Sequence, residues 1–184
     1  MEGRIVSPIH KSDRSVVFLG GSVSRPYEPL LEYHVDVLAP PERVWALVSD
    51  VRRMPEWSPQ VTSVRLRASF ERVELGTQFT NRNRHGDLEW TTRGEIVRFT
   101  QDHEVAFRIE ENRVVWSFTL QETAQGHTRL TQRRETPEGI SDVSLDLTDS
   151  HLGGQETFTA VLREGMRQTL ERVKAAVEGE AARS

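Results

Sequence analysis

The feature that most limits the fold of this chain is a long stripe of apolar residues in its C-terminal part. These residues recur at intervals of three and four, the spacing of one face of an α-helix. They are Phe158, Val161, Leu162, Met166, Leu170, Val173 and Val177. A single helix of roughly 35 Å cannot bury such a stripe alone. The rest of the chain must therefore supply an apolar surface that covers it.

The preceding sequence offers that surface as a series of alternating segments. A first strand is predicted where Tyr33, Val35 and Val37 alternate with less apolar neighbours. Six further strands are predicted at roughly 61–70, 76–85, 88–99, 103–111, 113–123 and 127–136. Short turns such as His85-Gly86-Asp87 separate most of them, so we expect an antiparallel meander.

The two faces of this predicted sheet differ in polarity. Val105, Phe107 and Ile109 share one parity, whereas arginines such as Arg82 and Arg108 occupy the other. Glutamates are interleaved with these arginines, so cross-strand ion pairs explain them without a polyanionic partner. One face is therefore predicted to be dry and available to the long helix.

Two short helices are predicted after the first strand. Pro40-Pro41-Glu42 suits a first helical turn, because proline is preorganised there and a carboxylate favours the positive end of the helix dipole. A second turn is predicted to follow Asp50 and to end before Pro55. The expected fold is therefore α+β of helix-grip type. A curved seven-stranded antiparallel sheet wraps around a long C-terminal helix, with two short helices after strand 1.

Composition excludes several classes of function. The 184 residues carry a formal net charge of -4, which gives no positive field for nucleic acid. The absence of cysteine removes disulfides, thiolate nucleophiles and cysteine-based zinc sites. No stretch approaches the roughly 20 apolar residues of a membrane-spanning helix. We expect a cytoplasmic protein, monomeric or homodimeric, with no cofactor, metal, nucleic-acid partner or stable membrane insertion.

The expected domain spans residues 31–178. Residues 1–30 are interpreted as an N-terminal extension, partly ordered or disordered, and 179–184 as a C-terminal tail. The polar residues 137–154 are predicted to form a solvated loop. Its aspartates Asp142, Asp146 and Asp149 do not have the spacing of a calcium-binding loop.

Three segments carry a resemblance to a known superfamily. They are VLAPPERVWALVSD at 37–50 with MPEWSP at 54–59, then GTQF, NRNR and WTT at 76–79, 81–84 and 90–92, and GMRQTLERVK at 165–174. These segments resemble the START-like or SRPBCC superfamily, which includes the Bet v 1 allergens, and in particular bacterial polyketide cyclase/dehydrase proteins. The resemblance implies the helix-grip fold. It leaves the activity open, because aromatases, cyclases, lipid carriers, hydrolase activators and quinone chaperones share that scaffold.

Polar residues on the predicted dry face point to a binding site. If Phe79 faces inward, strand parity turns Asn81 inward too. The same argument applies to Asn83, Trp90, Thr92, Gln132 and Arg134. Polar groups on an apolar face need partners, which a ligand, a water or another cavity wall could supply. Alternatively, Asn81, Asn83 and Arg134 lie at strand ends and are solvated or paired with each other.

The predicted ligand-binding set also contains large apolar residues, namely Trp57, Phe79, Phe107, Phe118 and Met166. Trp57, between Pro55 and Pro59, is the candidate for the cavity mouth. Two residues are candidates for catalysis. Arg134 could polarise a ketone or stabilise an enolate, and His151 could act as an acid or base at the entrance or simply lie beside a helix cap.

Two functional hypotheses follow. In the first, an internal cavity binds a hydrophobic small molecule, aromatic, polyketide-like or lipid-like, and the protein is either a carrier or a polyketide cyclase or dehydratase. In the second, it is a non-catalytic interaction or regulatory module whose vestigial cavity is filled by its own side chains. The direction of Arg134 and the packing of Phe79, Phe107 and Phe118 distinguish the two.

Overall fold

The computed structural model describes residues 27–140, 142–151 and 153–181. Within these ranges, seven strands form one antiparallel sheet in the order β1-β7-β6-β5-β4-β3-β2. The strands are β1 (Leu30–Val37), β2 (Val61–Leu66), β3 (Gln78–His85), β4 (Leu88–Thr100), β5 (Glu104–Ile109), β6 (Val115–Glu122) and β7 (Thr128–Glu135). The helices are α1 (Pro41–Val48), the 3₁₀ turn η1 (Val51–Arg53), α2 (Met54–Trp57), α3 (Asp142–His151) and α4 (Gly154–Ala181). The predicted helix-grip fold is confirmed. The predicted extension lies outside the described residues up to position 26.

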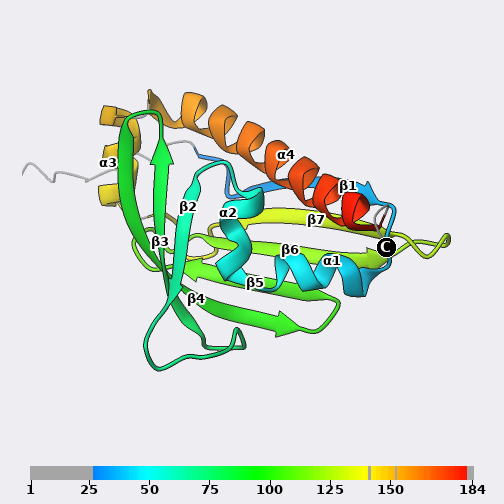
Figure 1. Cartoon of the computed structure of the whole chain (residues 1–184). Helices are drawn as coiled ribbons and strands as arrows, with labels where there is room; N and C mark the ends of the chain where they lie inside the picture. The colour runs from blue at the N-terminus through cyan, green and yellow to red at the C-terminus, as the bar shows by residue number, and fades with distance from the viewer. Residues whose placement is uncertain (1–26, 141, 152, 182–184) are drawn as a thin grey trace, which may run out of the picture.

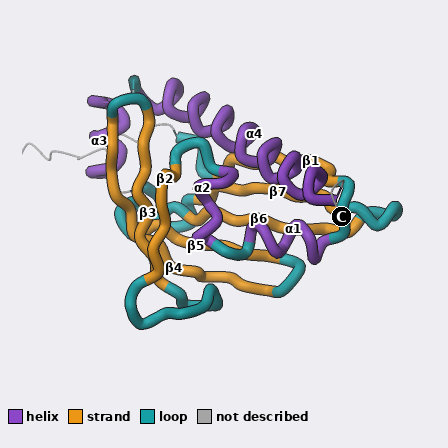
Figure 2. The backbone as a smooth tube through the Cα atoms, viewed as in Figure 1, coloured by secondary structure: helices purple, strands orange, loops and turns teal. Residues whose placement is uncertain are grey.

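The long helix α4 covers one face of the sheet. Figure 1 shows it crossing the strands, with α1 and α2 on the same side. In Figure 2 the β3–β4 hairpin rises at one end, so that the sheet curves around the helix. The predicted apolar stripe faces the sheet, since Leu162, Met166, Leu170, Val173 and Val177 are all buried. Sheet and helix therefore bury each other's apolar surface.

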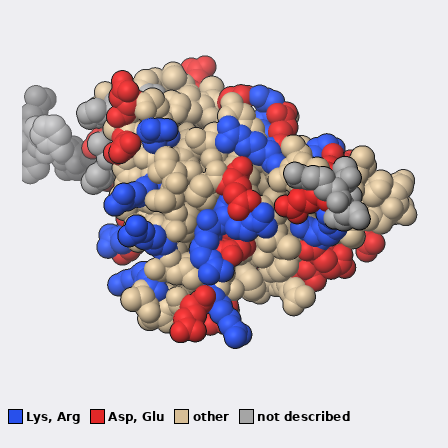
Figure 3. Space-filling view, in the orientation of Figure 1, with Lys and Arg blue, Asp and Glu red and all other residues tan. Residues whose placement is uncertain are grey.

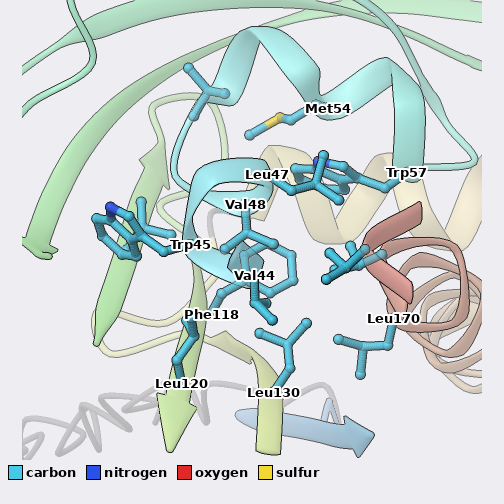
Figure 4. Packing of buried hydrophobic residues seen from close by; sticks show 14 of the residues in the cluster. Val44, Trp45, Leu47, Val48, Met54, Trp57, Phe118, Leu120, Leu130 and Leu170 are labelled. Carbon is cyan, nitrogen blue, oxygen red and sulfur yellow. The ribbon is translucent and has the colours of Figure 1, made fainter. Parts of the chain in front are cut away.

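A large part of the core lies where α1 packs on the sheet. Figure 4 shows Val44 of α1, Phe118 of β6 and Leu170 of α4 converging there. Trp45 packs edge-on against Phe99, with ring centroids 5.1 Å apart. This helix therefore closes one end of the space beneath α4.

The segment after α1 positions Trp57. Asp50 caps η1 by accepting a hydrogen bond from the Arg52 backbone N–H at 3.0 Å. The prediction that this helical segment ends before Pro55 was wrong, because α2 begins at Met54 and continues through Pro55. Proline is tolerated there because N–H groups in a first turn have no intrahelical acceptor. Trp57 is thus carried on a helical turn.

The prediction of a loop over 137–154 was also wrong for most of its length. It contains helix α3, which packs against α4. Leu145 and Thr148 lie three residues apart and are both buried, so one side of α3 is covered. The sequence signal was weak because polar residues outnumber apolar ones in this segment and do not form a broad apolar stripe.

The outer face of the sheet carries the predicted cross-strand ion pairs. Arg98 contacts Glu104 at 2.7 Å and Glu135 at 3.0 Å, and Arg129 contacts Asp36 at 2.9 Å. On the other side of the molecule, where Figure 3 looks onto the helices, positive and negative side chains are also interspersed. Exposed pairs of this kind stabilise a fold only slightly, but they account for these arginines without a polyanionic ligand.

Candidate functional site

A cavity of about 190 Å³ lies between the sheet and the N-terminal half of α4. Its walls come from α2 and the segment that follows it, from strands β2 to β7 and from α4. Most residues predicted to bind a ligand line it: Trp57, Asn81, Asn83, Trp90, Thr92, Phe107, Gln132, Arg134 and Met166. The strand parity deduced from the sequence therefore places these side chains on the face that encloses the cavity.

Phe79 and Phe118 lie elsewhere. Neither side chain has exposed surface, and both pack behind the cavity wall. Phe79 contacts Phe107 edge-on, with ring centroids 5.7 Å apart, and Phe118 contacts Trp57 in the same way at 5.3 Å. Alternation along a strand identifies the inward face but not how deep a side chain lies, which explains the difference.

One wall of the cavity is polar and comes from β3 and β4. Asn83 Nδ2 donates to Thr92 Oγ1 at 3.1 Å, so these two residues satisfy each other in part. Among the described residues, Asn81 Nδ2 has only the Met54 sulfur as a partner, at 3.9 Å, and its Oδ1 has none. Asn81 is 3% exposed and Asn83 8% exposed. These low exposed fractions do not fit the alternative that Asn81 and Asn83 are solvated at strand ends.

The facing wall is formed by two inward positions of β7. Gln132 and Arg134 are each 6% exposed, and Gln132 Oε1 has no partner among the described residues. No carboxylate in the described part of the chain pairs with Arg134. Burial lowers the pKa of the Arg134 guanidinium from its ordinary value, while the Tyr27 phenol acts in the opposite direction. A guanidinium nevertheless stays protonated at neutral pH.

Trp57 lines the cavity and is 3% exposed. Figure 4 shows its side chain beside that of Met54, which comes from the same turn. Its Nε1 has no acceptor among the described residues. The cavity wall thus combines apolar surface with unpaired polar atoms on Trp57, Asn81 and Gln132.

Several lining residues were missed by the sequence reasoning. Gly165 and Thr169 both face the cavity from α4. They occur on the same stripe as the apolar residues of this helix, with Thr169 between Met166 and Leu170, and Thr169 is buried. A small or polar residue on an otherwise apolar helix face was the signal that could have identified them.

The second catalytic candidate cannot be placed in the site. His151 ends α3, but its side chain lies outside the described part of the structure. No group of three or more His, Asp or Glu side chains among the described residues could hold a metal ion. Within the same residues, no helix has the length and hydropathy needed to cross a membrane.

The comparison with protein families decides the classification. The family described as polyketide cyclase / dehydrase and lipid transport matches residues 29–178. The chain belongs to this family. The resemblance to SRPBCC proteins noted in the sequence is thereby confirmed. Comparison with curated proteins finds no match.

Solved structures agree on the fold. The polyketide-cyclase-like protein Cgl2372 of Corynebacterium glutamicum is 24% identical with a TM-score of 0.60, covering 85% of this chain and 95% of that one. The ZhuI aromatase/cyclase of Streptomyces sp. R1128 is 17% identical with a TM-score of 0.61, covering 81% and 93%. The di-domain aromatase/cyclase StfQ of the steffimycin pathway is 17% identical with a TM-score of 0.65, covering 84% and 52%. At these identities, the matches show a shared fold.

Proposed function

We propose that this protein binds a hydrophobic small molecule in the cavity between α4 and the sheet. The observation that carries the proposal is a largely apolar wall that includes Trp57, Asn81 and Gln132, each with a buried polar atom that has no partner among the described residues. Leaving such an atom buried without a partner costs about 1–3 kcal/mol. A ligand with matching polar groups would offset that cost.

The cavity volume limits the size of the ligand. Pockets for drug-sized ligands measure about 300–1,000 Å³, and an engineered cavity of about 150 Å³ holds benzene. At about 190 Å³, this cavity suits a compound of one or two rings. A longer polyketide or acyl chain would require α4 to move away from the sheet. We therefore place an aromatic or polyketide-like ligand before a lipid-like one.

The chemistry of the lining favours a carrier over a cyclase. Among the described lining residues there is no carboxylate or imidazole to act as a general base. Arg134 could stabilise an enolate, but cyclisation and loss of water also require a proton acceptor. A cyclase or dehydratase therefore remains the second form of this proposal.

The alternative of an interaction module with a vestigial cavity is less well supported. It requires the centre to be filled by the protein's own side chains. Phe79 and Phe107 do meet, but a cavity remains beside them, and Arg134 faces into it. An open cavity with a buried cation favours ligand binding.

Gly165 provides a way to test whether the cavity is the binding site. A Cβ at this position would meet only Pro59 Cγ, at 4.0 Å, so a side chain can extend there from α4. Replacing a glycine inside a helix by a better helix former also stabilises the helix by about 1 kcal/mol. Gly165→Met should therefore fill the cavity without weakening the fold, and Gly165→Ala serves as the matched control.

The experiment combines native mass spectrometry, organic extraction of copurified compounds and calorimetric titration with 2-naphthamide, an uncharged two-ring probe. The wild type and Gly165→Ala should retain or take up a small molecule, and Gly165→Met should lose at least about tenfold in affinity. Equal binding by all three, or binding by none, would overturn the proposal.

A further inference from the structure

Arg134 is the only charged side chain among the described residues that line the cavity. The neighbouring carboxylates do not compensate it, because they belong to the opposite face of the sheet. Glu32, next to Leu31 on β1, pairs with Arg133, and Glu135 pairs with Arg98. Strand alternation thus separates the guanidinium from both acidic neighbours, and the cavity contains a positive charge that no carboxylate of the described residues pairs with.

The cross-strand neighbours of Arg134 are apolar. It lies in register between Leu31 of β1 and Trp116 of β6. Leu31 forms a small hydrophobic cluster with Leu162 and Met166 of α4, and Trp116 packs against this cluster. A cation in such surroundings loses hydration, and that cost is recovered only if an anion pairs with it in good geometry.

The shape of the guanidinium indicates which anion. Its planar fork presents parallel N–H donors that match the two oxygens of a carboxylate, and this charge-assisted pair is among the strongest available to a side chain. The flat apolar surface of Trp116 beside it suits a ring attached to that carboxylate.

We infer that the ligand is a small aromatic carboxylic acid whose carboxylate pairs with Arg134 and whose ring lies against Trp116 and the cavity face of α4. This inference rests on the proposed function, since it specifies the ligand of the same cavity. It goes beyond it by assigning the ligand a negative charge and a binding orientation.

The test uses two probes of nearly the same shape, 2-naphthoate and 2-naphthamide, titrated by calorimetry at neutral pH. Arg134→Met keeps much of the side-chain length but removes the charge. Arg133→Met, one residue away on the outer face, is the matched control because it removes an exposed arginine from the same strand. Arg134→Lys keeps the charge but loses the fork.

We expect the wild type and Arg133→Met to bind 2-naphthoate at least about tenfold more tightly than 2-naphthamide. Arg134→Met should bind both probes alike, and Arg134→Lys should fall between. Without ligand, the melting temperature of Arg134→Met should be no lower than that of the wild type, because the substitution removes a desolvated charge. This separates loss of recognition from loss of folding.

Other outcomes contradict the inference in distinguishable ways. If the wild type binds both probes equally, or if Arg134→Met still prefers 2-naphthoate, the acid is not recognised through Arg134, although the cavity still binds small molecules. If neither probe binds the wild type, both the inference and the proposed function are overturned.

Discussion

The two halves of α4 face the same sheet but enclose different interiors. Leu170, Val173 and Val177 in the C-terminal half are at most 2% exposed and belong to the main core. In the N-terminal half, Leu162, Gly165 and Met166 line the cavity, which extends to Thr169 just past the midpoint. One continuous amphipathic stripe therefore does not imply one continuous core. The point at which small and polar residues enter the stripe marks where close packing ends.

Strand β7 shows the same change on the opposite side. Its successive inward residues are Leu130, which is fully buried in the core, then Gln132 and Arg134, which face the cavity. On both the helix and the strand, apolar core residues thus give way to polar or small residues at the same end of the molecule. The binding site lies where these residues take the place of core residues on both sides of the contact between α4 and the sheet.

The largest expected effect comes from truncating a leucine in each half of α4. Leu170 is 0% exposed within the core, and Leu162 is 9% exposed beside the cavity. Leucine-to-alanine changes in cores cost about 2–5 kcal/mol. The loss of stability should lie at the upper end of this range for Leu170→Ala and at the lower end for Leu162→Ala, because part of Leu162 already borders the cavity. Urea denaturation measures both, and equal losses would contradict the division of the helix.

A smaller effect is expected at Gly94, on the cavity side of the sheet. A Cβ there would lie 2.4 Å from Cζ of Phe79, so the glycine is required by the ring that packs on it. Gly94→Ala should cost about 1–3 kcal/mol through overpacking. The double variant Gly94→Ala with Phe79→Leu should recover part of that loss in the same denaturation experiment. If the single variant is as stable as the wild type, the ring does not need this space.

The smallest effect concerns the exposed side of α4 at the boundary between its halves. Arg167, and secondarily Gln168, lower the pKa of Glu164 to about 2 from an ordinary value of 4.5. A carboxyl whose pKa is lowered in the folded state contributes stability above its unfolded pKa, and this is lost as the pH falls from about 4.5 toward 2. Between about pH 4.5 and 2, the melting temperature of Glu164→Gln should therefore depend on pH slightly less than that of the wild type. The difference is small because the pair is exposed. Superimposable curves would show that the pair contributes nothing.

Much of the fold could be predicted because two periodicities were unusually clear. The spacing of three and four from Phe158 to Val177 specified α4, and alternation specified the strands and the inward face that contains Asn81 and Arg134. These patterns depend on local geometry, which a single sequence records directly.

The remaining features depend on tertiary contacts that no local pattern records. Phe79 and Phe118 share the predicted parity, yet their depth is set by packing partners far away in the chain. Helix α3 is stabilised by its packing on α4 rather than by a broad stripe of its own. Helix propensity and pattern are weak guides in such a segment.

The pairing of β1 with β7 has a consequence for the order of events during synthesis. The ion pair between Asp36 and Arg129 joins residues 93 positions apart, so β1 cannot pair with β7 until that later segment has been made. Helix α4, which follows every strand, then supplies the final wall of the cavity. Pairing over such separations is slow compared with local folding. The compartment beneath α4 is therefore completed late, and a growing chain has no enclosed site to offer until that helix has docked.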